Sequence, residues 1–311
     1  MARRPDRPSG GGRHQGWTSR SFGTALQHRI FYFFIRLGGR PAAYLLLYHV
    51  VGYYTLFRPS IRGRTAYYLT RRFPGKGRTG RLLDAYRLSL AFGKALVDRA
   101  AVGILGPDAM DVTVRGREEM LHLVARGRGL VLMTAHVGCW QASMSVLHCL
   151  GVPVHLVMRR DEGEVDRHYF EHAGLPCPFR IIDPAEDSLG GTVETMQALK
   201  RGEVVCLMGD RVFGSLRNTL HVPFLGEPVR FPLGAFGIAA AAGAPVAVLF
   251  SHKTGPRGYE LYLAATIEVP EGTGMHGKAL RPAVTSFVEA LEKFTQDHPY
   301  QFFNFYDLWS I

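Results

Sequence analysis

Residues 130–141 read LVLMTAHVGCWQ, an apolar run that leads into a histidine. Residues 130–135 are apolar except for Thr134. A strand with one solvent-exposed face would instead alternate apolar and polar residues. A short continuous apolar run is typical of a strand buried on both faces of a parallel sheet. The stretch therefore predicts a strand, a loop and a helix, with His136 in the loop at the carboxyl end of the strand.

The same pattern continues toward the C-terminus. Apolar runs predict further strands at 154–158, 180–182, 204–208, 245–250 and 259–267, and helical patterns occupy 140–150, 162–173, 188–201, 232–242 and 280–297. Strands that alternate with helices predict an α/β fold, with a mostly parallel sheet and helices on both faces. We assign residues 105–311 to this domain.

Toward the N-terminus the pattern becomes entirely helical. Helices are predicted at 28–38, 42–57, 60–72 and 82–104, from apolar residues that recur at three- and four-residue intervals. Residues 1–27 are rich in Gly, Arg, Pro and Ser, which predicts a flexible basic tail. Residues 28–104 form a helical region that precedes the α/β domain, and we expect it to associate with a membrane for the reasons that follow.

The positive charge is concentrated in the first quarter of the chain. Residues 1–81 contain sixteen Lys and Arg but one acidic residue, Asp6, while the whole chain carries a net charge of +11. Such a segment can contact nucleic acid or an anionic membrane surface. Residues 30–57 are mostly aliphatic and aromatic and have arginines on both sides, which fits a bilayer interface better than nucleic acid.

The apolar run after Pro41 is about 17 residues, the short limit for spanning hydrocarbon. We therefore expect these helices to be peripheral or shallowly embedded, with an anionic membrane surface as partner and no nucleic acid. A buried helical hairpin of a soluble protein is the alternative interpretation. A nucleic-acid-binding protein is a further alternative, motivated only by the charge.

Polar residues follow three of the predicted strands. His136 follows the strand at 130–135, Arg159 follows 154–158, and Asp210 and Arg211 come shortly after 204–208. In open α/β sheets, sites collect at the carboxyl ends of strands. A histidine base can deprotonate a hydroxyl so that it attacks a thioester directly, and arginines can hold a phosphate.

Other chemistries fit the sequence less well. It contains no G-x-S-x-G elbow, Walker loop, H-E-x-x-H or dinucleotide-binding glycine pattern. Cys139 lies close to His136, but nothing near it predicts an activated thiolate. The spacing of cysteines and histidines predicts no metal site, and a single histidine could also be a hydrogen-bonded structural residue.

Several motifs, in this order, resemble the bacterial lipid A biosynthesis acyltransferase family, within the lysophospholipid acyltransferase superfamily. His136 to Gln141 read HVGCWQ, similar to the family's H-F-G-N-W-E. The similar blocks that follow are LKRGEVVCLMGD (199–210), HVPFLGEPVRFP (221–232, a loop in the family pattern), GAPVAVLF (243–250) and PYQFFNFYDLW (299–309). The resemblance covers residues 17–310.

The resemblance implies a glycerolipid-acyltransferase-like fold and an enzyme on the cytoplasmic face of the bacterial inner membrane. The acyl donor would be an acyl carrier protein or acyl-CoA, with no other cofactor and no metal. The acceptor would be a hydroxyl of a membrane glycolipid or related amphiphile. His136 would be the general base with Gln141 beside it as second catalytic residue, and Arg159, Asp210 and Arg211 would bind substrate.

Gln141 departs from the family pattern, which has an acid at that position. An amide oxygen can accept a hydrogen bond from the imidazole N–H but supplies no charge. Asp210 can compensate only if the fold brings it within about 8 Å of His136, close enough for direct or single-water contact. The alternative function is a non-catalytic membrane-associated binder of lipid or carrier protein that has lost the acid.

Overall fold

A seven-stranded sheet forms the centre of the computed structural model, which describes residues 25–140, 147–158, 179–184, 190–212, 216–273 and 277–310. The strand order is β1-β9-β8-β2-β5-β3-β4, and only β8 and β9 pair in antiparallel fashion. The strands are β1 (Asp111–Arg115), β2 (Leu130–Thr134), β3 (Val154–Val157), β4 (Arg180–Ile182), β5 (Val204–Met208), β8 (Val246–Lys253) and β9 (Gly258–Ile267). The predicted α/β class with a mostly parallel sheet is confirmed.

Helices cover both faces of this sheet. Val131 and Met133 of β2 belong to a large core that also contains residues of α3, α8 and α9, whereas Leu130 and Leu132 belong to a second core with α4 and the 3₁₀ turn η2. This division follows from the two-residue period of a strand. The elements on the two faces are α3 (Arg78–Leu105), α4 (Arg117–Ala125), η2 (Leu147–Leu150), α7 (Gly190–Lys200), α8 (Gly234–Ala242) and α9 (Gly277–Asp297).

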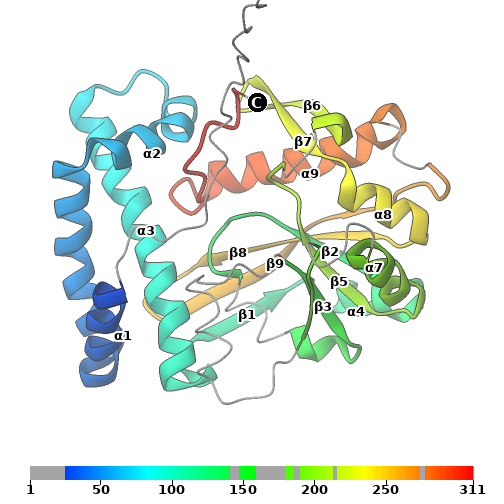
Figure 1. Cartoon of the computed structure of the whole chain (residues 1–311), viewed down its shortest axis with the longest axis horizontal. Helices are drawn as coiled ribbons and strands as arrows, with labels where there is room; N and C mark the ends of the chain where they lie inside the picture. Colours follow the sequence, from blue (N-terminus) through cyan, green and yellow to red (C-terminus); the bar gives the residue numbers. More distant parts are fainter. Residues whose placement is uncertain are drawn as a thin grey trace, which may run out of the picture.

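The N-terminal helices stand beside the sheet, with α3 between the sheet and α1 (Figure 1). α1 (Ala25–Phe57) contains the two predicted helices, because the backbone leaves the helical region at Gly38 and Gly39. Gly39 has a φ of 65°, a conformation that glycine adopts at little cost. α2 (Pro59–Arg72) then leads into α3. The four predicted N-terminal helices are thus confirmed.

α1 keeps much of its apolar surface exposed. Its inner side packs on α3 in a small cluster of its own that includes Ile35, Leu47 and Val97. Its outer side exposes Leu26, Phe33, Leu37, Leu45, Leu56 and Phe57. Of the described residues, Leu26–Phe57 are together long and apolar enough to cross a membrane by length and composition, and the break at Gly38 and Gly39 divides them into two helices. This exposure departs from the expectation for a fully buried hairpin.

A buried polar cluster connects α1 to the sheet. Asp98 of α3 is fully buried and accepts hydrogen bonds from Lys253 Nζ (2.7 Å) and the Tyr259 hydroxyl (2.6 Å). From α1, the Tyr44 hydroxyl also donates to Asp98, and Arg40 Nη1 lies 3.6 Å from it. We call these five residues the Asp98 cluster. It joins α1, α3, β8 and β9 through one carboxylate.

α2 is attached to the far end of the sheet domain. Arg72 donates to the carbonyls of Thr295 and Gln296 at the end of α9, and the Tyr68 hydroxyl donates to the carbonyl of Pro299. Tyr68 also belongs to the large core of the sheet domain. The helical region therefore packs on the α/β domain, and the boundaries at 27/28 and 104/105 stay predictions.

Some elements differ from the prediction. Residues 221–232, a loop in the family pattern, lie in an antiparallel hairpin of β6 (Thr219–Phe224) and β7 (Glu227–Pro232). The edge strand β1 and helix α4 were not predicted. In the predicted helix 140–150, residues 147–150 form a 3₁₀ turn and 141–146 lie outside the described residues. The predicted helix 162–173 and most of the tail 1–27 also lie outside them.

Candidate active site

Strand register places His136 beside Asp210. β2 and β5 are parallel neighbours in which Leu130 pairs with Val204 and Thr134 with Met208. The pairing continues beyond the strands, since the Gly209 N–H donates to the Thr134 carbonyl at 2.9 Å. His136 and Asp210 each lie two residues past the last paired position. The two side chains therefore meet at the carboxyl edge of the sheet.

The contact between His136 and Asp210 is direct. Nδ1 of His136 lies 2.9 Å from Oδ1 and 3.0 Å from Oδ2 of Asp210, and the backbone N–H of His136 donates to Oδ2 at 3.1 Å. The Asp210 side chain is 2% exposed and that of His136 is 21% exposed. An ionised carboxylate only accepts hydrogen bonds, so Nδ1 carries the proton and Nε2 is the basic nitrogen of the neutral ring.

The surroundings favour this pair of protonation states at neutral pH. Burial lowers the pKa of His136 below its ordinary value; Asp210 opposes this effect and Arg211 adds to it. Burial alone would raise the pKa of Asp210, but His136 and Arg211 outweigh it and hold that pKa below its ordinary value. The arrangement is a neutral imidazole oriented by an ionised carboxylate.

The loop that carries His136 packs closely against β8. Gly138 has a φ of 54°, and a Cβ there would lie 2.0 Å from the carbonyl oxygen of Ser251. The Ser251 hydroxyl also accepts the Cys139 N–H at 3.2 Å. Only glycine fits this approach of the loop to β8. Cys139 itself is buried, and its thiol lies 3.9 Å from the carbonyl oxygen of Ala95 in α3.

The C-terminal segment, residues 300–306, forms the other support of this loop. The Phe303 N–H donates to the His136 carbonyl at 2.8 Å, and the Gly138 N–H donates to the Gln301 carbonyl at 3.0 Å. Phe302 between them is fully buried and pairs with Val137 across an isolated bridge. In the sequence, these aromatic residues stand out only as part of the block PYQFFNFYDLW (299–309). Their contact with the histidine loop was missed, because no local pattern announces a pairing across about 165 residues.

Arg211 turns from the pair toward the C-terminal segment. Its side chain is buried, Nη2 donates to the Phe303 carbonyl at 3.1 Å, and its guanidinium carbon lies 5.5 Å from the centroid of the Tyr306 ring. Burial lowers the pKa of Arg211, and Asp210 opposes this effect. Arg211 thus adds positive charge close to the His136–Asp210 pair.

The structure brings together His136, Asp210 and Arg211 of the predicted site residues. Gln141 and Arg159 lie outside the described residues. Within the described ranges, no group of three or more His, Cys, Asp or Glu side chains could hold a metal ion.

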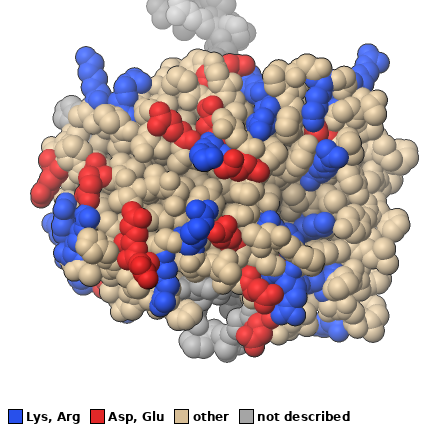
Figure 2. All heavy atoms as spheres, turned by 180° about the vertical axis from the view of Figure 1, so that it is seen from behind, with Lys and Arg blue, Asp and Glu red and all other residues tan. Residues whose placement is uncertain are grey.

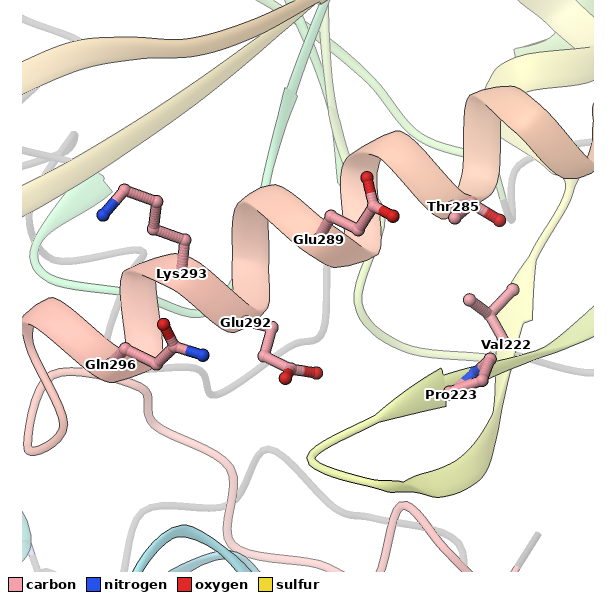
Figure 3. A pocket seen from close by; sticks show the side chains of 7 residues that line it. All are labelled: Val222, Pro223, Thr285, Glu289, Glu292, Lys293 and Gln296. Atoms are coloured by element: carbon pink, nitrogen blue, oxygen red, sulfur yellow. The ribbon is translucent and has the colours of Figure 1, made fainter.

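A separate cavity of about 360 Å³ lies between α9 and the β6–β7 hairpin (Figure 3). Glu289, Glu292 and Lys293 of α9 line it together with Val222 and Pro223 of β6, and the Glu292 side chain points toward the hairpin. Glu292 also accepts the N–H of Leu225 at the hairpin tip, at 2.8 Å. Neither His136 nor Asp210 lines this cavity, so it is distinct from the candidate site.

The fold and the site define an α/β protein with a carboxylate-oriented histidine at the carboxyl edge of its sheet. A family model described as bacterial lipid A biosynthesis acyltransferase matches residues 90–310, and the chain belongs to this family. The resemblance inferred from the motifs is confirmed, and the chain is an acyltransferase. No match is found among curated proteins.

Proposed function

We propose that the protein transfers an acyl group from a carrier-protein or coenzyme A thioester to a hydroxyl of a membrane glycolipid or related amphiphile, with His136 as general base. Membership of the family supports acyl transfer to a lipid A-like acceptor. The observation that carries the role of His136 is the 2.9 Å contact between its Nδ1 and Asp210. This contact makes Nε2 the basic nitrogen of the ring.

The reaction requires one proton to move twice. Nε2 of His136 takes the proton of the acceptor hydroxyl as the oxygen attacks the thioester carbonyl. The carbon–sulfur bond then breaks, the new ester is released, and the imidazolium returns the proton to the departing thiolate. Asp210 stabilises the imidazolium between these events.

Asp210 therefore takes the role that the family pattern gives to the acid at position 141. This assignment differs from the substrate-binding role expected from the sequence. Gln141 supplies no charge, whereas the Asp210 carboxylate contacts the ring directly. We retain Gln141 as a second catalytic candidate, and Arg159 and Arg211 as groups for the phosphate of the donor or acceptor.

The alternative function, a binder without catalysis, is favoured only by Gln141. A binder has no need of a neutral imidazole oriented by a buried carboxylate. Transfer of label from acyl-carrier protein or acyl-CoA to a total membrane lipid extract tests the proposed function. We expect an alkali-labile labelled lipid that depends on the enzyme. Intact donor together with bound lipid and carrier protein would favour the binder.

The pH dependence of kcat/KM follows from the histidine. The base acts in its neutral form, and the pKa of His136 is lowered from the ordinary value of 6.5. We therefore expect a plateau at neutral pH and an acid limb with its midpoint below 6.5. Initial rates of transfer at subsaturating donor, between pH 4.5 and pH 8 (about the range where histidine titrates), measure it. A midpoint above pH 6.5, the ordinary pKa of histidine, would contradict a buried neutral base.

Docking of α1 on the anionic cytoplasmic face of the inner membrane brings the enzyme to its acceptor. The family is one of membrane-associated acyltransferases, and α1 exposes an apolar side. Residues 25–72 contain eight arginines and no acidic residue. On the face behind the view of Figure 1, acidic and basic side chains are otherwise interspersed, with no continuous field of one sign (Figure 2). Apolar and basic groups on the same helices suit an anionic bilayer.

Glutamates on the outer side of α1 should release the protein from vesicles. Leu37 and Leu45 are 71% and 64% exposed. Replacing both by Glu removes apolar contact and adds charges that anionic lipid repels, so we expect vesicle affinity to fall at least about tenfold. Co-sedimentation with phosphatidylglycerol-containing vesicles measures this. Val193→Glu is the control, since Val193 is also exposed and its helix α7 lies on the opposite side of the sheet from α1 (Figure 1). Equal binding by all three proteins would contradict docking through α1.

A further inference from the structure

The C-terminal segment contacts both the His136 loop and Arg211. Phe303 bonds to the His136 carbonyl through its N–H and to Arg211 through its carbonyl. A single residue thus connects the loop of the base to the arginine that follows Asp210. Because both contacts use backbone atoms of Phe303, their geometry depends on how the rest of the segment is held.

Tyr306 holds the other side of Arg211. The guanidinium carbon lies 5.5 Å from the Tyr306 ring centroid, within the range of a cation–π contact. Burial and the nearby Asp210 raise the pKa of Tyr306, and Arg211 opposes this effect. Asn304 is buried, and its Nδ2 donates to the Tyr306 carbonyl at 2.9 Å, so the backbone between residues 304 and 306 is fixed.

We propose that Tyr306 is a positioning residue for acyl transfer: its ring keeps Arg211 against the Phe303 carbonyl and so holds the His136 loop and Asp210 in place. The inference rests on the proposed function of His136. Tyr306 acts through Arg211 and takes no part in the proton transfers. The C-terminal segment is accordingly part of the active site, although it is far from His136 in sequence.

Removing the Tyr306 ring should change the pKa of His136, which a general loss of stability would not do. Among the described residues, the charged groups that act on the His136 ring are Asp210, which raises its pKa, and Arg211, which lowers it. When Arg211 loses the Tyr306 ring and can move away, the lowering contribution weakens. The acid limb of kcat/KM should therefore move to higher pH.

The test compares substitutions at Tyr306 and Tyr300 in the full-length protein. For Tyr306→Ala we expect kcat to fall about tenfold and the acid limb of kcat/KM to move to higher pH. Tyr306→Phe keeps the aromatic face and should resemble wild type. Tyr300→Ala is the matched control: the Tyr300 ring lies in the same segment but contacts Phe73 and Asp84. It should lower the melting temperature and leave the acid limb in place.

Tyr306→Leu, which keeps apolar volume without an aromatic face, replaces Tyr306→Ala if that variant does not fold. A wild-type acid limb in the folded variant, with kcat no lower than in Tyr300→Ala, would overturn the role of Tyr306. His136→Ala in the same series separates the two proposals. Full activity of His136→Ala would overturn the proposed function and with it the role of Tyr306. If His136→Ala is inactive, the proposed function stands, and the Tyr306 variants test the role of Tyr306 separately.

Discussion

Asp210→Asn should lower kcat/KM for acyl transfer by about 10²- to 10⁴-fold while the protein stays folded. Asp210 accepts hydrogen bonds from both the Nδ1–H and the backbone N–H of His136. An asparagine at this position can still accept one hydrogen bond, but it cannot stabilise the imidazolium. Its amide can also donate to Nδ1, which would place the ring proton on Nε2 and remove the base.

The comparison that makes this result specific is Gln141→Glu. If Asp210 already supplies the negative charge, a second acid should add little in the wild-type background and restore part of the activity in Asp210→Asn. Initial rates with labelled donor measure the effect of Gln141→Glu in the wild-type protein and in Asp210→Asn. Circular dichroism verifies that each variant is folded. Activity of Asp210→Asn within about twofold of wild type would exclude Asp210 as the partner of the base.

Asp98→Asn should lower the free energy of unfolding by about 3–5 kcal/mol, because it leaves the buried Arg40 and the partly buried Lys253 without their counter-charge. Lys253 and Arg40 both face Asp98, which is fully buried, and Arg40 is itself buried. An asparagine can keep some of the hydrogen bonds but none of the charge. Urea unfolding at neutral pH, followed by circular dichroism, measures the change.

A suitable control is Asp297→Asn, which breaks the exposed pair of Asp297 with Lys293 on α9. Exposed pairs contribute about 0–1 kcal/mol, so a large difference between the two variants is expected. Equal, small effects would mean that the Asp98 cluster does not hold α1 and α3 to the sheet.

Much of the fold could be predicted because its signals are local. The apolar run at 130–135 became β2, and the Gly38–Gly39 pair marked the break in α1. The β6–β7 hairpin shows a local pattern too, since Val222 and Phe224 of β6 and Val229 and Phe231 of β7 are buried at alternate positions. The family pattern instead suggested a loop, so this alternation was overlooked.

The residues of the candidate site could be predicted from the sequence, but their contacts could not. His136 and Asp210 were each found at a strand end, but their contact depends on β5 lying next to β2, and chain order does not determine the order of parallel strands. The contacts of Phe303 and Tyr306 with the site are even harder to predict from the sequence. It depends on a chain segment folding back from the end of α9 onto the histidine loop, which is a property of the tertiary structure.

The most direct test of the central claim is acyl transfer by wild type and His136→Ala, with radiolabelled acyl-carrier protein as donor and a membrane lipid extract as acceptor. The variant should stay folded and bind vesicles like wild type, because the buried Asp210 keeps the backbone N–H of residue 136 and the nearby Arg211. We predict labelled lipid with wild type and a loss of about 10²-fold or more with His136→Ala. Labelled lipid formed at equal rates by both proteins would contradict the account.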